Sequence, residues 1–160
     1  MKHLIVIVVL FLGNLAFGQT LRTTFSNDFS KWKFDNISFR TTFINGFDQW
    51  QCSGTTIRTT FSNDWDSWKI GNSITLRTVF SNDFDSWEIR GEGKTIRIRT
   101  TFSNDKGRWD VSGDADGTIR TVFSNDMERW DIDVDFEGLS GELKKAIIFV
   151  AIFASFQEQI

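Results

Sequence analysis

The stretch that decides the fold is "IRTTFSNDWDSWKI", Ile57–Ile70, which is apolar at both ends and polar in the middle. Apolar and polar residues alternate from Ile57 to Phe61 and again from Trp68 to Ile70. A period of two places successive side chains on opposite faces of a β-strand. The Asn in the polar middle tolerates a left-handed backbone and favours turns. The stretch therefore predicts two short strands joined by a tight loop.

The same unit occurs six times, with copies that begin near residues 21, 39, 57, 76, 98 and 119. The loop inside each copy has a constant length, whereas the Gly- and Asn-rich connection between copies varies, as hairpin turns do. Six pairs of strands predict a mainly β domain, an antiparallel meander of about twelve short strands, curled or barrel-like. The alternative is a β-solenoid with one coil per copy and the constant Asn stacked as a ladder.

The alternation predicts that two rows of aromatic residues share one face of the sheet. Burial of a large apolar side chain contributes roughly 1.5–3 kcal/mol, and a dozen exposed rings would cause aggregation. We therefore expect this face to be covered. The two rows are Phe25, Phe43, Phe61, Phe80, Phe102 and Phe123, and Trp32, Trp50, Trp68, Trp87, Trp109 and Trp130.

The C-terminal segment, residues 139–160, supplies a cover for the apolar face. Ser140 is a predicted helix N-cap and Glu142 suits the first turn. From Ala146 to Phe156 the segment is apolar on every side except at Ser155. Eleven helical residues reach only about 16 Å, roughly half of a bilayer core. The segment is therefore predicted to be a buried helix on the concave face of the sheet, in the same domain as residues 19–138.

The first 18 residues have the pattern of a secretory signal peptide. A basic Lys2 precedes the apolar run Leu4–Leu12, and the small residues Ala16 and Gly18 mark a cleavage site after Gly18. An N-terminal membrane anchor is the alternative, but the apolar run is short for a span. We expect a secreted or periplasmic protein, in association with the cell surface or free, without a stable membrane span after cleavage.

The inventory of reactive side chains argues against an enzyme. The one His, His3, falls in the predicted signal peptide, which leaves no His-based triad or zinc site. Cys52 occupies an apolar strand position and is predicted to pack as a small hydrophobe. Residues 131–142 resemble an EF-hand loop but carry Phe136 where that loop needs Gly. The sequence therefore predicts no catalytic residue, metal or cofactor. A carboxylate-dependent glycan hydrolase is the remaining enzymatic alternative.

The outer face is predicted to carry an Arg ladder, with acidic cross-strand neighbours in the last three copies only. The ladder is predicted to be a solvated face whose charge pairs set the strand register. In the alternative interpretation, its acid-free first half is a surface for an anionic partner. The net charge of −3 gives no electrostatic footprint for nucleic acid. The ladder consists of Arg22, Arg40, Arg58, Arg77, Arg99 and Arg120, and the acidic neighbours are Glu88, Asp110 and Asp131.

The loop tips are the candidate binding site. The residue after the Asn-Asp or Asn-Gly pair is aromatic in the first four copies and is Lys106 or Met127 in the last two. Rings can stack on the apolar faces of pyranoses while amides hold hydroxyl groups. In the alternative interpretation each ring folds under its own loop and fills the end of the core. The candidate ligand-binding residues are Phe29, Phe47, Trp65, Phe84, Asn27, Asn63 and Asn82.

These observations predict a secreted, non-catalytic binding module of the cell envelope or extracellular space. Its partner would be a glycan, a surface polymer or another protein. A purely structural envelope or matrix protein is the alternative. The arrangement is similar in style to MORN-type hairpin repeats, which also have about twenty residues and aromatic strands. Because the MORN glycine pattern is absent, this resemblance implies no function.

Overall fold

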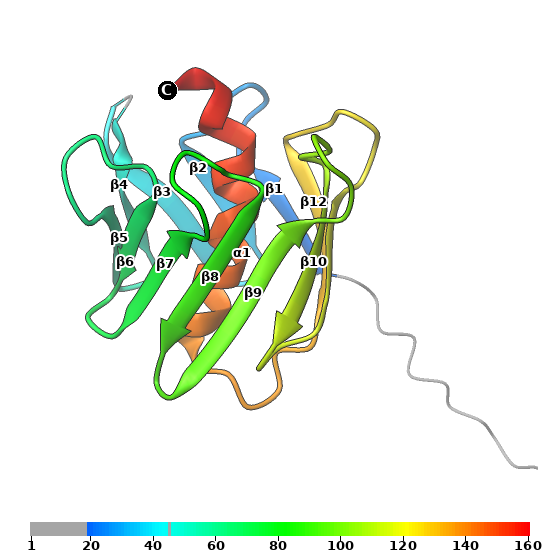
Figure 1. The fold of residues 1–160 in the computed structure, drawn as a ribbon. Helices are drawn as coiled ribbons and strands as arrows, with labels where there is room; N and C mark the ends of the chain where they lie inside the picture. The colour runs from blue at the N-terminus through cyan, green and yellow to red at the C-terminus, as the bar shows by residue number, and fades with distance from the viewer. Residues whose placement is uncertain (1–18, 45) are drawn as a thin grey trace, which may run out of the picture.

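The computed structural model describes residues 19–44 and 46–160, which form a closed antiparallel β-barrel around one helix (Figure 1). The predicted signal peptide lies outside the described residues. The mainly β, barrel-like fold with a C-terminal helix is confirmed, and the solenoid alternative is wrong because consecutive strands pair as antiparallel hairpins. The strands are β1 (Gln19–Thr23), β2 (Lys31–Phe34), β3 (Ile37–Phe43), β4 (Gly46–Cys52), β5 (Thr55–Thr59), β6 (Ser67–Ile70), β7 (Ile74–Thr78), β8 (Ser86–Gly91), β9 (Lys94–Thr100), β10 (Arg108–Gly113), β11 (Gly117–Thr121) and β12 (Arg129–Val134).

The barrel closes between its first and last strands. β1 pairs with β12 in antiparallel register, with Leu21 opposite Trp130, just as β1 pairs with β2 on its other side. Each sequence copy contributes two adjacent strands, so the first and last copies become neighbours. Every strand of the described sheet therefore has two partners, and no unpaired edge remains to template aggregation.

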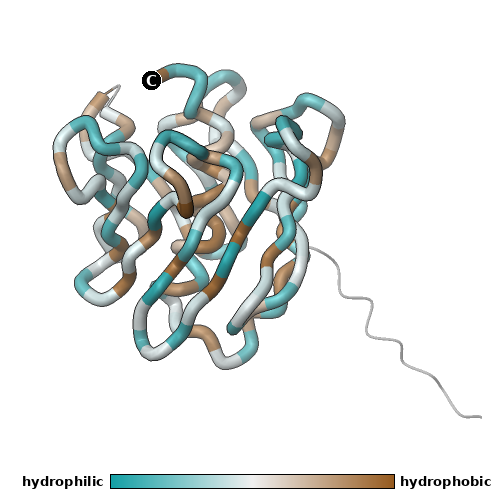
Figure 2. Tube along the Cα trace, in the orientation of Figure 1, coloured by the Kyte–Doolittle hydropathy of each residue, from teal (hydrophilic) through white to brown (hydrophobic). Residues whose placement is uncertain are grey.

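The six Trp residues of the second aromatic row face the interior, where each is at most 1% exposed. The helix α1 (Gly141–Phe156) runs through the barrel (Figure 1) and is buried from Ala146 to Phe156. Ser140 caps it as predicted, since its side chain accepts the N–H of Leu143. Figure 2 shows this central helix as apolar, with hydropathy alternating along the strands around it. Among the described residues, no helix has the length and hydropathy needed to cross a membrane.

Rings on one side of the helix hold it against the middle of the sheet. Phe149 meets Trp68 edge to face with ring centroids 4.9 Å apart, and Phe153 meets Trp87 in the same way at 4.9 Å. On the other side, Ser155 Oγ accepts a 2.9 Å hydrogen bond from the indole of Trp130. The helix thus offers large rings to one half of the barrel and a small polar residue to the other.

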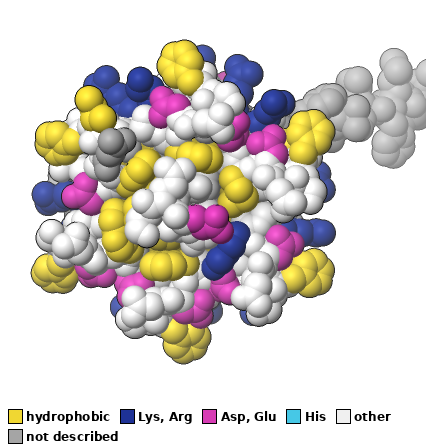
Figure 3. All heavy atoms as spheres, turned by 90° about the horizontal axis from the view of Figure 1, so that it is seen from above, with side chains coloured by type: hydrophobic (Ala, Val, Ile, Leu, Met, Phe, Trp, Pro, Cys, Tyr) yellow, Lys and Arg dark blue, Asp and Glu magenta, His cyan; other side chains and the backbone are white. Residues whose placement is uncertain are grey.

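The predicted burial of the first aromatic row is wrong. Phe25, Phe43, Phe61, Phe80, Phe102 and Phe123 are 59–70% exposed. In the third copy the reason is local: β5 ends at Thr59, and the chain bends at Thr60 and Phe61 before the turn. The alternation of the strand therefore no longer governs the direction of the Phe side chain. Figure 3 looks down on the loop end of the barrel and shows hydrophobic side chains spaced around its margin.

Candidate functional site

The Phe-Ser-Asn-Asp loops form rigid turns at one end of the barrel. Asn63 has a φ of 58°, in the left-handed region that Asn tolerates. The N–H of Asp64 donates to the carbonyl of Phe61 at 3.1 Å, and the carboxylate of Asp64 accepts the N–H of Asp66 at 3.1 Å. This Asx turn holds Phe61 and Asn63 outward. The described loop Asn residues, Asn27, Asn63, Asn82, Asn104 and Asn125, all have φ between 57° and 63°.

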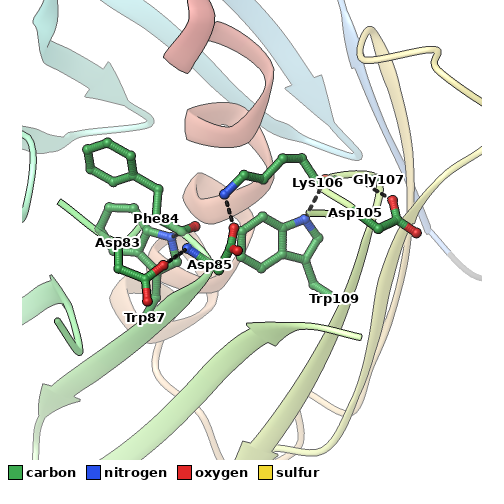
Figure 4. Close-up of polar contacts among 8 residues, drawn as sticks. All are labelled: Asp83, Phe84, Asp85, Trp87, Asp105, Lys106, Gly107 and Trp109. Carbon is green, nitrogen blue, oxygen red and sulfur yellow. Dashed lines mark hydrogen bonds and ion pairs between the residues drawn. The ribbon is translucent and has the colours of Figure 1, made fainter. Parts of the chain in front are cut away.

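Each inner Trp ties its loop to the barrel mouth. The indole N–H donates to the backbone carbonyl of the residue three positions earlier, at 2.7–3.3 Å in all six copies. Figure 4 shows this bond from Trp109 to Lys106, and the same arrangement holds Phe84 above Trp87. This hydrogen bond fixes the residue three positions before each Trp over the core. The side chain of that residue therefore determines how the mouth of the barrel is filled.

The four predicted ligand-binding rings, Phe29, Phe47, Trp65 and Phe84, lie at this fixed position and are half-buried against the core. Phe47 stacks on Phe156 at a centroid distance of 4.8 Å, and Phe84 packs on Phe153 at 5.0 Å. These contacts favour the interpretation in which the rings fill the end of the core. Their role toward a ligand stays a prediction.

The predicted amides Asn27, Asn63 and Asn82 are exposed at the loop tips. The exposed ring in each loop is the Phe two positions before the Asn, which the strand alternation had placed inside. The signal that could have identified it is its position directly before Ser-Asn, within the turn rather than within the strand. The structure thus brings Phe61 and Asn63 together at the surface and separates Asn63 from the half-buried Trp65.

Neighbouring loops are joined by carboxylates, a contact that the sequence did not reveal. The carboxylate of Asp66 accepts from Ser81 Oγ at 3.0 Å and from the N–H of Asn82 at 3.0 and 3.1 Å. Glu128, at the equivalent position of the last copy, accepts in the same way from Ser26 Oγ and the Asn27 N–H across the barrel closure. A backbone N–H beside a left-handed residue is a good anion donor. The Ser-Asn pair is therefore a carboxylate-binding site at these two loop interfaces.

The next interface uses a different contact. Asp85, equivalent to Asp66, forms an ion pair with Lys106 of the following loop (Figure 4). Burial lowers the pKa of Lys106 below its ordinary value, although the charge of Asp83 opposes this shift. Lys106 stands where the first four copies carry an aromatic ring, so an ion pair replaces ring packing here.

A hollow of about 690 Å³ lies between the fifth and sixth loops, which we call the Gly107 pocket. Three features leave this space: Lys106 and Met127 replace aromatic rings, the helix presents Ala154, and Gly107 has no side chain. It thus occupies the half of the barrel mouth that the rings of the helix do not reach. Its lining includes Lys106, Gly107, Arg108, Ser124, Asn125 and Ala154.

The outer wall carries a concentrated group of charges. The side chain of Glu88 is only 8% exposed and lies 3.0, 2.7 and 3.6 Å from Arg77, Arg90 and Arg97. Hydrogen bonds from Arg90, then from Arg77, lower the pKa of Glu88, while burial opposes them. This confirms the predicted pairing of the Arg ladder with acids at Arg77.

The other two predicted ladder pairs differ from each other. Arg120 meets Asp131 at 3.0 Å, as expected. Arg99 lies opposite Asp110 in the register of β9 and β10, but no ion pair joins them in the part of the chain that the structure describes.

The remaining reactive groups offer little chemistry. Cys52 is fully buried, and burial raises the pKa of its thiol to about 12, although Lys145 opposes the shift. The thiol therefore stays protonated at neutral pH. Within residues 19–44 and 46–160, no three metal-ligating side chains come together.

Comparison with known proteins gives no relative: no family model, curated protein or solved structure matches this chain.

Proposed function

We propose that this protein is a non-catalytic glycan-binding module that works in the cell envelope or extracellular space. The observation that carries the proposal is the ring of six equivalent Phe residues, 59–70% exposed, at one end of the barrel. Five of them, all except Phe43, are followed directly by an exposed Ser-Asn turn. The signal-peptide pattern of residues 1–18 supports export. Six exposed Phe rings around one margin are more than the singly scattered apolar residues that a protein surface normally carries.

Because the interior of the barrel is filled with side chains, a ligand would have to bind on its outside. The helix and the six Trp side chains occupy the space that many barrels use to hold a ligand. The outer margin of the loop end therefore remains as the place where a partner can reach apolar and polar groups together. The rigid turns, each tied by an indole hydrogen bond, keep these groups preorganised.

The chemistry of one loop suits a sugar. In the third copy, the ring of Phe61 can cover the apolar face of a pyranose while Ser62 and Asn63 exchange hydrogen bonds with hydroxyl groups. Asn27 and Asn82 take the same role in their loops. We assign Phe29, Phe47, Trp65 and Phe84 a supporting part, because they hold the loops from beneath. This moves the stacking role from these rings to the exposed Phe row.

Six equivalent loops favour an extended polymer over a single small molecule. One Phe and one amide make a weak site, but linked sites act at a high effective concentration and raise the overall affinity by factors of about 10²–10⁴. A linear polysaccharide with regularly spaced residues could engage several loops around the margin.

A glycan array tests the proposal. We expect the purified protein to retain at least one polysaccharide and the double variant Phe61→Ala/Phe80→Ala to lose about tenfold or more in affinity. Its melting temperature should change little, because both rings are exposed. The matched control is Val79→Ala, which removes an exposed apolar side chain beside Phe80 and should bind normally. An array without any ligand would reject the glycan function and favour a structural role. An unchanged affinity in the double variant would reject the exposed Phe rings as the binding site.

A further inference from the structure

The Gly107 pocket lacks a carboxylate that two equivalent loop interfaces have. Asp66 and Glu128 each follow their loop Asn by three positions and bind the Ser-Asn pair of the neighbouring loop. Gly107 occupies this position in the fifth copy, facing Ser124 and Asn125 of the sixth. The chain thus repeats the receiving half of a carboxylate site but omits the carboxylate.

The charge of the pocket also suits an anion. Lys106, Arg108 and Arg120 line it, against the carboxylates of Asp105 and Glu158. Lys106 pairs with Asp85 and Arg120 with Asp131, whereas no ion pair to Arg108 occurs among the residues that the structure describes.

The two acids of the pocket do not take the place of the missing carboxylate. Asp105 is engaged in its own turn, where it accepts the N–H of Gly107 at 2.9 Å. Glu158 follows the end of α1 and is exposed. Arg108 lies opposite Arg120 on adjacent strands, so the two guanidinium groups stand on the same face of the sheet.

We propose that the Gly107 pocket binds the carboxylate of a uronic acid residue. Ser124 Oγ and the Asn125 N–H receive the carboxylate, as Ser81 and Asn82 receive Asp66, and Arg108 forms a charge-assisted hydrogen bond with it. The choice of a sugar acid rests on the proposed glycan function. It is supported by Phe102 and Phe123, which are 61% and 60% exposed on the two loops that flank the pocket. The volume of about 690 Å³ is in the range of small-molecule sites.

The geometry of Gly107 allows a direct test. Its φ lies outside the left-handed region, and a Cβ there would meet Asp105 Oδ1 at 3.2 Å and Thr121 Oγ1 at 3.3 Å. Both neighbours are side-chain atoms that can shift slightly. Gly107→Asp would therefore place a carboxylate of the protein itself in the pocket, as Asp66 does at its own interface. This carboxylate would compete with a ligand for Ser124 and Asn125.

The experiment follows the backbone amide signal of Asn125 by NMR during titration with glucuronate. We expect a saturable shift in the native protein and its loss in Gly107→Asp. The matched control, Gly107→Asn, has the same size without the charge and should keep the shift. Arg108→Gln should weaken binding about tenfold, the equivalent of about 1.4 kcal/mol. Glucose tests the need for the carboxylate, and acetate tests the contribution of the sugar ring. Melting temperatures of all variants check that they fold.

Three results would overturn the assignment: equal shifts in native protein and Gly107→Asp, equal shifts with glucose and glucuronate, or acetate binding as tightly as glucuronate. The glycan function and the pocket fail separately. An empty glycan array together with a glucuronate shift that Gly107→Asp removes would reject the glycan module and support the carboxylate pocket. Array hits restricted to neutral glycans, without any glucuronate shift, would support the module and reject the pocket.

Discussion

At the scale of single residues, the same side-chain type has opposite roles according to its surroundings. The carboxylate of Asp66 joins two loops through neutral donors, whereas Glu88 lies beneath three guanidinium groups on the barrel wall. Each Arg around Glu88 is more than half exposed, so the carboxylate gathers three solvent-facing cations over a small area. Hydrogen bonds and charges from these guanidinium groups favour the ionised form of the buried acid.

Replacement of Glu88 should change how stability depends on pH. Because the pKa of Glu88 is lowered in the folded state, its ionised form contributes stability above the ordinary Glu pKa, and this contribution is lost as the pH falls through the folded value. Glu88→Gln should cost about 1–3 kcal/mol at pH 7, in the range of hydrogen bonds to charged groups. The variant should also lose less stability between pH 7 and pH 3 than the native protein. Urea denaturation at several pH values measures both effects, and parallel curves for the two proteins would contradict the expectation.

At the scale of elements, each loop of the first four copies separates a supporting ring from an exposed ring four positions away. Trp65 lies half-buried on Trp68 at a centroid distance of 5.8 Å, whereas Phe61 is 70% exposed. Two aromatic residues in one turn thus face different environments, and their substitutions should affect different properties.

The pair Trp65→Ala and Phe61→Ala tests this separation. Trp65→Ala should destabilise the protein by about 3 kcal/mol, the lower end for a large core ring, because the side chain is only half-buried. Phe61→Ala should stay within about 0.5 kcal/mol of the native protein, as exposed positions do. Thermal and urea denaturation of both variants decide the matter. A stability loss of the same size in the two variants would show that the outer ring also supports the fold.

Much of each element could be predicted from the sequence, and the failures have local causes. The alternation correctly places Trp68 and Ile70 inside, and the Ser140 cap correctly starts the helix. The alternation fails at Phe61 because the strand ends at Thr59. A hydrophobic pattern does not reveal where a strand ends before a turn. The prediction of an Asn turn succeeds because its cause lies within a few residues.

The candidate site was less predictable because its parts come from distant segments. The contact between Glu128 and Asn27 depends on closure of the barrel, which sets residues about a hundred positions apart beside each other. The Gly107 pocket exists because Gly107 has no side chain and because the helix turns the small residue Ala154 toward it. The change from rings to Lys106 and Met127 in the last copies is visible in the sequence, but its effect requires the helix to be in place.

At the scale of the whole molecule, the number of strands fixes the width of the barrel. A barrel's diameter grows roughly in proportion to its strand number. Twelve strands enclose a helix together with a layer of six Trp side chains. The packing of Phe149 and Phe153 between helix and sheet depends on this width.

Removal of one full copy, residues 57–75, should therefore abolish the native fold rather than shorten it. Ten strands would give a barrel about one sixth narrower. The interior would then be too narrow for the helix and its rings. We expect the deletion variant to lose cooperative thermal unfolding and to aggregate, as measured by circular dichroism and size-exclusion chromatography. A soluble monomer with a sharp transition would show that the helix is dispensable or repositioned.

The pairing of β1 with β12 has a consequence for how such a chain can arise and diverge. A repeat protein with an open sheet can gain or lose units one at a time, because its last strand always leaves an edge with which the next unit can pair. A ring closed around a fixed core has a permitted copy number, and a gene that duplicates or drops a unit encodes a product whose ends no longer meet around the helix. Unequal recombination among the similar units would thus be purged, while substitutions at exposed loop positions would be tolerated. The individual loops can therefore change in sequence independently while the count of units stays at six.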